Sequence, residues 1–333
     1  MDELIEILIL LGGFFVAWNI GANDTANCVG VAVGGRTLSY RRAIAIVALF
    51  VILGAVLEGG KNMTTVGEGI VIPKLGAANP LSAVPLATLA VLLAAGAWVL
   101  IATVLGLPIS TSQSMVGAVI GAGVLITTMR PDLGASLQYG KLGSIGISWI
   151  LNPIIAALVA FILVKVVSHF LRRVKNIILM NQVLSILILI ASAYSAYTLG
   201  ANDVGTSAGA VHAFFGGPQQ IIALLGGVAL VVGTITFSRR VISTVGSGIT
   251  TLDATTAFGA QFGAALVVWS FVQFGMPVST SQAIVGAVAG AGLVRGASTV
   301  SSKKLGRIGV AWVLTPIIGF VLSIGIGWVL LGL

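Results

Sequence analysis

Two short motifs place an aspartate within apolar sequence: GANDTAN at residues 21–27 and GANDVGT at residues 200–206. An aspartate at the middle of a bilayer costs roughly 2.5–3.5 kcal/mol on insertion scales, so such residues usually bind an ion or move a proton. The first glycine of each motif permits a helix to unwind and expose carbonyl oxygens, which would complete a hard-cation site of oxygen ligands. The alternative is that each motif only caps a helix. The expected cation ligands are Asn23, Asp24, Asn27, Asn202, Asp203 and Thr206.

A second pair of motifs is rich in hydroxyl groups: PISTSQ at residues 108–113 and PVSTSQ at residues 277–282. In each, a proline precedes a Ser/Thr run, and a glycine-rich apolar helix is expected to follow. The unpaired N–H groups and the positive dipole end of a helix N-terminus attract anions. Simple N-capping is the alternative. Because no arginine or lysine is near, bound cations would have to balance the anion's charge. The expected anion ligands are Ser110, Thr111, Ser112, Gln113, Ser279, Thr280, Ser281 and Gln282.

The composition predicts that these motifs lie in a membrane. Of the 333 residues, 57% are hydrophobic and only 8% are charged, against roughly 25% charged in a soluble domain. Apolar runs near or above the ~20 residues of a membrane-spanning helix recur along the chain, and the alternation of a membrane β-barrel is absent. The acidic start, MDELIEILIL, differs from a secretory signal peptide and is expected to begin the first span. The net charge of +8 resides in short loops, so nucleic acid is not an expected partner.

The chain reads as two copies of one unit, residues 1–172 and 173–333, within one integral membrane domain. Four motifs recur in the same order, which chance does not explain. They are GANDTAN and GANDVGT, TVGEGI (65–70) and TVGSGI (244–249), LPISTSQSMVGAVIGAG (107–123) and MPVSTSQAIVGAVAGAG (276–292), and KLGSIGISWILNPIIA (141–156) and KLGRIGVAWVLTPIIG (304–319).

The distribution of basic residues predicts that the two copies have inverted topology. Each copy holds about five candidate membrane segments, an odd number, so the second copy would enter from the opposite side. With both termini outside, thirteen basic residues lie inside and four outside, as the positive-inside rule requires. The inside set is Arg36, Arg41, Arg42, Lys165, Arg172, Arg173, Lys175, Arg239, Arg240, Arg295, Lys303, Lys304 and Arg307, and the outside set is Lys61, Lys74, Arg130 and Lys141.

The expected fold is therefore an all-α polytopic membrane protein of two inverted repeats. The STSQ segments are either broken helices that cross once or re-entrant hairpins. Pro153 and Pro316 are expected to kink their spans, and Asp253 to cap the following helix. The candidate segments are 4–34, 43–60, 83–106, 109–128 and 143–170 in the first copy, and 177–212, 218–237, 253–274, 278–294 and 308–332 in the second.

These four acidic and hydroxyl motifs resemble those of the inorganic phosphate transporter (PiT) family. The resemblance covers nearly the whole chain, with each signature once per half in the expected order. It implies secondary transport of inorganic phosphate coupled to sodium or protons, a duplicated inverted fold and a substrate site between the halves. The second acidic motif departs from the first at its end, where Thr206 replaces Asn27, so the two cation sites need not be equivalent.

The resulting hypothesis is phosphate import by cation symport, preferably with sodium, through alternating access in the cell inner (plasma) membrane. Asparagine and hydroxyl oxygens beside each aspartate favour sodium over protons. Cations at the two aspartates would cancel the charge that otherwise repels phosphate. No cofactor other than the coupling ions is expected, and a homodimer is an open possibility. The alternatives are a proton-coupled phosphate permease, a sulfate carrier of the same fold and an anion channel. An enzyme is not expected, because no Ser–His–Asp set, metal cluster or nucleotide motif occurs within the spans.

Overall fold

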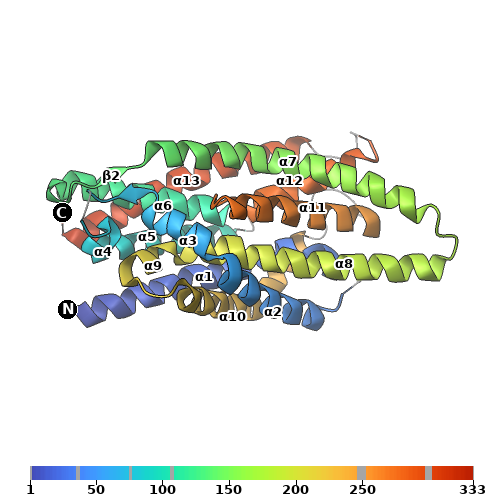
Figure 1. Cartoon of the computed structure of the whole chain (residues 1–333), viewed down its shortest axis with the longest axis horizontal. Helices are drawn as coiled ribbons and strands as arrows, with labels where there is room; N and C mark the ends of the chain where they lie inside the picture. Colours follow the sequence, from blue (N-terminus) through green and yellow to red (C-terminus); the bar gives the residue numbers. More distant parts are fainter. Residues whose placement is uncertain are drawn as a thin grey trace.

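The computed structural model is a bundle of long helices lying roughly along one axis, with both chain termini at the same end (Figure 1). It describes residues 2–34, 38–74, 77–105, 109–245, 253–296 and 302–332. Within these ranges, nine helices are long and apolar enough to cross a membrane, and a shorter apolar helix spans Thr280–Leu293. Arg36, Pro108 and residues 246–249 of the second TVGSGI motif lie outside the described residues.

The long helices of the two halves follow the same order, whereas the short elements between them differ. The first half comprises α1 (Asp2–Gly34), α2 (Tyr40–Glu58), α3 (Gly60–Glu68), β1 (Val71–Ile72), α4 (Pro80–Ala83), α5 (Pro85–Val104), α6 (Thr111–Met129), η1 (Pro131–Leu133), β2 (Ser136–Leu137) and α7 (Tyr139–Leu171). The second comprises α8 (Ile177–Leu199), η2 (Gly200–Val204), α9 (Gly205–Phe215), α10 (Gln219–Val245), α11 (Ala254–Gln273), α12 (Thr280–Leu293) and α13 (Ser302–Leu331). The two short strands pair in antiparallel register.

The outer surface of the bundle is apolar, as a lipid-facing surface must be. On α7, Ile147, Ile150, Ile154 and Leu158 recur every three or four residues and are each about 60% exposed, so they form one stripe along the helix. Water would disfavour such a stripe, whereas hydrocarbon accepts it. This surface agrees with the predicted all-α membrane class.

Glycines let the two halves approach backbone to backbone in matched places. A Cβ on Gly21 would overlap the carbonyl oxygen of Leu230, and a Cβ on Gly200 would overlap that of Val51. Gly200 follows Gly21 by 179 residues, and Leu230 follows Val51 by the same number. The two contacts are therefore equivalent, with the roles of the two halves exchanged. The motif glycines are therefore needed for close helix packing.

The same reciprocity holds at the other end of each repeat. A Cβ on Gly117 of α6 would overlap the carbonyl oxygen of Pro316 in α13, and one on Gly286 of α12 would overlap that of Pro153 in α7. Through these contacts α13 packs on the first half and α7 on the second. The two halves thus interlock into one body.

Each STSQ motif lies at the tip of a helical hairpin. Helix α5 packs on α6, and α11 packs on α12. In Figure 1, α5 and α6 lie towards the left end of the bundle and α11 and α12 towards the right. The tips of the two hairpins are in contact. The Ser112 hydroxyl of one tip donates to the carbonyl oxygen of Val278 in the other, across 2.9 Å.

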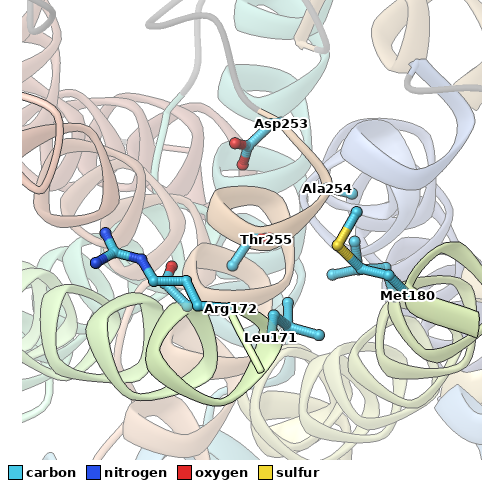
Figure 2. Close-up of a pocket in the computed structure, with 8 residues that line it drawn as sticks. Leu171, Arg172, Met180, Asp253, Ala254 and Thr255 are labelled. Carbon is cyan, nitrogen blue, oxygen red and sulfur yellow. The ribbon is translucent and has the colours of Figure 1, made fainter. Parts of the chain in front are cut away.

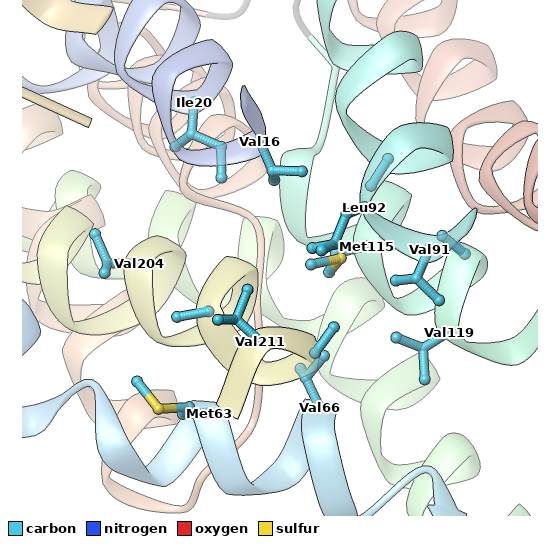
Figure 3. Close-up of a cluster of buried hydrophobic side chains, with 14 of the residues drawn as sticks. Val16, Ile20, Met63, Val66, Val91, Leu92, Met115, Val119, Val204 and Val211 are labelled. Atoms are coloured by element: carbon cyan, nitrogen blue, oxygen red, sulfur yellow. The ribbon is translucent and has the colours of Figure 1, made fainter. Parts of the chain in front are cut away.

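The largest apolar cluster surrounds one side of this meeting point. It draws buried side chains from α1, α2, α3, α5, α6, α8, α9 and α10, and so joins helices of both halves. Figure 3 shows Val16, Ile20, Met63, Val66, Val91, Leu92, Met115, Val119, Val204 and Val211 pointing into this cluster.

Candidate functional site

Asp24 of α1 and Asp203 of η2 meet at a single hydroxyl group. The Thr111 hydroxyl lies 2.9 Å from Oδ2 of Asp24 and 3.1 Å from Oδ1 of Asp203. Both carboxylates are buried, with 0% and 1% of their residue surface exposed. One hydroxyl hydrogen serves only one acceptor well, so the pair is short of donors. The acidic motifs of the two halves form one cluster rather than two separate sites.

Asp24 also contacts the tip of the second hairpin. Its Oδ1 accepts hydrogen bonds from the Ser281 hydroxyl and from Nδ2 of Asn27, each at 3.0 Å. Asn27 Nδ2 lies 2.9 Å from the Ser281 hydroxyl as well. The carboxylate of the first half is thus bonded to hydroxyl groups from both STSQ motifs.

Asp203 has fewer partners than Asp24. Its Oδ2 is buried without a hydrogen-bond partner among the described residues. A buried carboxylate oxygen without a donor is costly unless a cation or a proton compensates it. This oxygen is therefore the group at the cluster that most requires a positive ligand.

Asn202, beside Asp203, pairs with the backbone of the second hairpin tip. Its Nδ2 donates to the carbonyl oxygen of Val278 at 2.6 Å, and its Oδ1 accepts from the Val278 N–H at 3.2 Å. Nδ2 of Asn62 in α3 donates to the same Oδ1 at 3.0 Å. The side chain of Asn202 therefore anchors the hairpin next to the carboxylates.

The two STSQ motifs begin helices, as predicted, and their first serines are the caps. Ser110 accepts from the Gln113 N–H at 3.2 Å, and Ser279 accepts from the Gln282 N–H at 3.1 Å. The capping alternative thus describes these two hydroxyls. Three other polar atoms of these motifs have no hydrogen-bond partner within the described part of the chain. They are the buried Thr280 Oγ1, Gln113 Oε1 and Gln282 Oε1.

Asn23 and Thr206 are bonded away from the carboxylates. Asn23 Nδ2 donates to the Thr103 hydroxyl of α5 at 2.7 Å. The Thr206 hydroxyl donates to the carbonyl oxygen of Asn202, one turn earlier, at 2.6 Å. Hydrogen bonds therefore connect three of the six expected cation ligands. Asp24 is bonded directly to Asn27, and it is linked to Asp203 through the Thr111 hydroxyl.

The expected unwinding at the motif glycines is wrong for the first half. Helix α1 is continuous through residues 21–27, and the Gly21 carbonyl oxygen accepts from the Thr25 hydroxyl at 2.7 Å. In the second half, η2 is a π-helical turn, a local widening that often occurs at functional sites. The physical reason is that Gly21 and Gly200 serve helix packing, which does not require the backbone to open.

Three polar residues near the cluster were not singled out from sequence. Asn62, Trp149 and Asn152 all bond to the second hairpin tip or to Asn202. A signal for Asn152 exists, since it is an amide within an apolar span where the other repeat has Thr315. Its partner could not be known from sequence because it lies 127 residues away.

A cavity of about 410 Å³ lies elsewhere, where the end of α7 and the start of α8 meet the N-terminus of α11 (Figure 2). Arg172, Met180 and Thr255 are among its lining residues. Asp253 at its edge accepts from the Thr256 N–H in a capping box, as predicted, and pairs with Arg295. The cavity is separate from the carboxylate cluster.

Comparison with known proteins gives consistent matches. Residues 20–323 match the family model described as the phosphate transporter family. Two similar proteins are named "Putative phosphate permease". One, from Pyrococcus abyssi, is 30% identical over 96% of each chain. The other, from Haemophilus influenzae, is 29% identical over 96% of this chain and 94% of its own. A solved structure described as the sodium-dependent phosphate transporter has a TM-score of 0.86 and 27% identity, covering 99% of this chain and 100% of that one.

Proposed function

This chain belongs to the phosphate transporter family, and from that premise we propose that it imports inorganic phosphate by symport with sodium through alternating access. The chain is a multi-pass membrane protein, and phosphate transport follows from its family. One observation supports the finer proposal above all others. The two buried carboxylates are bonded to hydroxyl groups at the tips of both hairpins, through Thr111 and Ser281.

Phosphate near this cluster requires bound cations. Two carboxylates that share one hydroxyl would repel an anion strongly in a site shielded from water. Cations at Asp24 and Asp203 cancel that charge, and Asn27, whose Nδ2 is bonded to Asp24, can offer its amide oxygen to a cation there. Because each ligand then raises the affinity of the other by the same factor, the two bind cooperatively. This mutual requirement is the basis of symport.

The hydrogen bonds suggest how cation binding prepares the phosphate site. The hydroxyls of Thr111 and Ser281 donate to carboxylate oxygens. A cation bound by those oxygens competes with the hydroxyl hydrogens for the same lone pairs. Cation binding therefore releases the hydroxyls to donate to phosphate. The two helix N-termini that begin at Ser110 and Ser279 add their positive dipole ends.

Sodium is the proposed coupling ion rather than the proton. Amide and hydroxyl oxygens around a carboxylate form the oxygen-ligand set of a hard cation. The structural relative of 27% identity is described as sodium-dependent, which supports the same choice. The proposed phosphate ligands lie in the two STSQ motifs, where Ser110 and Ser279 act as helix caps, and the proposed sodium ligands centre on Asp24 and Asp203.

The proposed transport cycle uses inverted repeats spanning residues 1–172 and 173–333. The reciprocal glycine contacts support this division. In Figure 1, α1 runs from left to right, whereas its counterpart α8 starts at the right and runs left towards α9. Two interlocked units of opposite direction can exchange conformations to give outward-open and inward-open states. From the charge bias, we place both termini outside the inner membrane.

Uptake into liposomes tests the proposal. Purified protein is reconstituted, and labelled phosphate uptake is measured with an inward sodium gradient, with a proton gradient alone, and with excess sulfate. We expect concentrative uptake only with the sodium gradient, with little inhibition by sulfate. Uptake driven by the proton gradient alone would reject sodium coupling. Equal competition by sulfate would reject selectivity for phosphate.

A further inference from the structure

The segment Pro277–Ser279, which forms the tip of the hairpin α11–α12, is bonded to two side chains of α7. The indole Nε1 of Trp149 donates to the carbonyl oxygen of Pro277 at 3.1 Å. Nδ2 of Asn152 donates to the carbonyl oxygen of Ser279 at 2.8 Å. Asn152 is fully buried. The Pro277 carbonyl oxygen precedes α12, whereas the Ser279 carbonyl oxygen also accepts the first intrahelical bond, from the Ala283 N–H at 3.0 Å.

The positions of Trp149 and Asn152 on α7 suit this joint role. Residues three apart lie on the same face of a helix. Asn152 is followed by Pro153, whose carbonyl oxygen lies against Gly286 of α12 so closely that a Cβ there would overlap it. The backbones of α7 and α12 are therefore in contact beside Asn152. The position of α7 thus sets the position of the hairpin tip.

This tip carries the hydroxyl group that contacts Asp24. Ser281, two residues beyond Ser279, donates to the Asp24 carboxylate at 3.0 Å. Val278, between the two clamped carbonyls, accepts from Ser112 of the other hairpin. A small shift of the tip would therefore change the distance from α12 to the carboxylates and to the first hairpin.

The equivalent residues of the second repeat make no such bonds within the described part of the chain. Trp312 and Thr315 stand 163 residues after Trp149 and Asn152 in the matched sequence. Nε1 of Trp312 is buried without a partner among the described residues. The Thr315 hydroxyl donates to the carbonyl oxygen of Ala311 in its own helix, at 2.7 Å. Among the residues that the structure describes, this pair of bonds to a hairpin tip therefore occurs on α7 and has no counterpart on α13.

We propose that Trp149 and Asn152 are positioning residues of the phosphate site. They hold the α11–α12 tip at the depth where the N-terminus of α12 and the Ser281 hydroxyl face the carboxylates. Neither side chain is assigned to contact phosphate itself. The proposal rests on the proposed function, because it gives these residues a role at the site where phosphate and sodium meet.

The test compares two variants with a matched control. Asn152→Thr introduces the residue type found at the equivalent position, Thr315. We expect the new hydroxyl to donate to a carbonyl oxygen of α7 itself, as the Thr315 hydroxyl does in α13, and so to leave the Ser279 carbonyl oxygen without this donor. Trp149→Phe keeps an aromatic ring and removes the N–H donor. Trp312→Phe is the control, because its N–H has no partner within the described residues. Equilibrium binding of labelled phosphate in saturating sodium, sodium binding without phosphate, and the Tm are measured on purified full-length protein.

We expect Asn152→Thr and Trp149→Phe each to weaken phosphate binding about tenfold, or ~1.4 kcal/mol, because the tip no longer rests where α12 and Ser281 face the carboxylates. Sodium binding should change much less than phosphate binding, the Tm should fall only by the small cost of one hydrogen bond, and Trp312→Phe should bind phosphate normally. An equal loss of phosphate and sodium binding with a lowered Tm would show a merely structural role and overturn the proposal. So would unchanged phosphate binding in both variants, or an equal loss in Trp312→Phe. A wild-type protein that binds no phosphate would instead reject the proposed function on which this inference rests.

Discussion

The Ser281 hydroxyl of α12 donates a hydrogen bond to the Asp24 carboxylate of α1 across 3.0 Å. This contact joins a residue of the expected anion motif to one of the expected cation motif, from opposite halves of the chain. A cation bound at the Asp24 carboxylate would therefore weaken the hydrogen bond from the Ser281 hydroxyl to that carboxylate. In the proposed symport, coupling between sodium and phosphate would follow from this shared contact without a long-range pathway.

Removing the charge of either aspartate should abolish sodium-driven phosphate uptake. Asp24→Asn and Asp203→Asn keep the size of the side chain and remove the negative charge that compensates a cation. We expect no concentrative uptake from either variant in liposomes with an inward sodium gradient. Elution as a single species on size exclusion and an unchanged Tm would show that the variants fold. Wild-type uptake by either one would remove the basis for its role as a cation ligand.

The hydroxyls of one STSQ motif should differ in what they contribute. Ser279→Ala removes the N-cap of α12 and should cost about 1 kcal/mol of stability, seen as a lower Tm. Ser281→Ala removes the contact to Asp24 and should weaken phosphate binding about tenfold, at ~1.4 kcal/mol per decade, with little change in Tm. Binding and thermal unfolding are measured on the same preparations. If Ser279→Ala reduced only phosphate affinity and Ser281→Ala only stability, these two assignments would be reversed.

The packing glycines should tolerate no side chain. In Gly200→Ala, the new Cβ would overlap the Val51 carbonyl oxygen. We therefore expect the free energy of unfolding to fall by about 1–3 kcal/mol, the usual cost of overpacking. Gly325→Ala on α13 is the matched control, because a Cβ there meets nothing within 4 Å. Thermal unfolding in detergent measures both. A Tm for Gly200→Ala equal to that of Gly325→Ala would show that the helices separate without cost.

The charge bias predicts which end of the bundle faces the cytoplasm. In a Cys28→Ser background, a cysteine at Arg42 should be protected from an impermeant thiol reagent added outside intact cells. A cysteine at Gln219, at the start of α10, should react. The reverse pattern of labelling would place the termini in the cytoplasm and contradict the proposed orientation.

The class of fold could be predicted from sequence because it depends on local composition and on repetition. Apolar runs specify spans in a bilayer, and the repeated motifs indicate which residues have equivalent positions. The capping roles of Ser110, Ser279 and Asp253 follow from their place before apolar helices. The hairpin and the single-crossing alternatives could not be distinguished, because both have the same sequence pattern.

What sequence could not supply is the identity of partners across the fold. The glycines at 21 and 200 carry the same signal whether a helix unwinds there or packs closely, and only the neighbouring Leu230 and Val51 backbones decide. Asn23 belongs to a motif that suggests a ligand, yet its amide bonds to Thr103 of α5. Asn27, four residues further on, bonds to Asp24 and Ser281. Asn23 and Asn27 are one helical turn apart, yet they have different partners because different helices surround them.

The most direct test of the central claim is the equilibrium linkage between sodium and phosphate. Phosphate Kd is measured on purified wild-type protein across a range of sodium concentrations at constant ionic strength, and sodium Kd across a range of phosphate concentrations. Because binding free energies are reciprocal, sodium should tighten phosphate binding by the same factor by which phosphate tightens sodium binding, and we expect that factor to be about tenfold or more. A phosphate Kd that stays constant from zero to saturating sodium would contradict the claim that the Asp24–Asp203 cluster couples the two ligands.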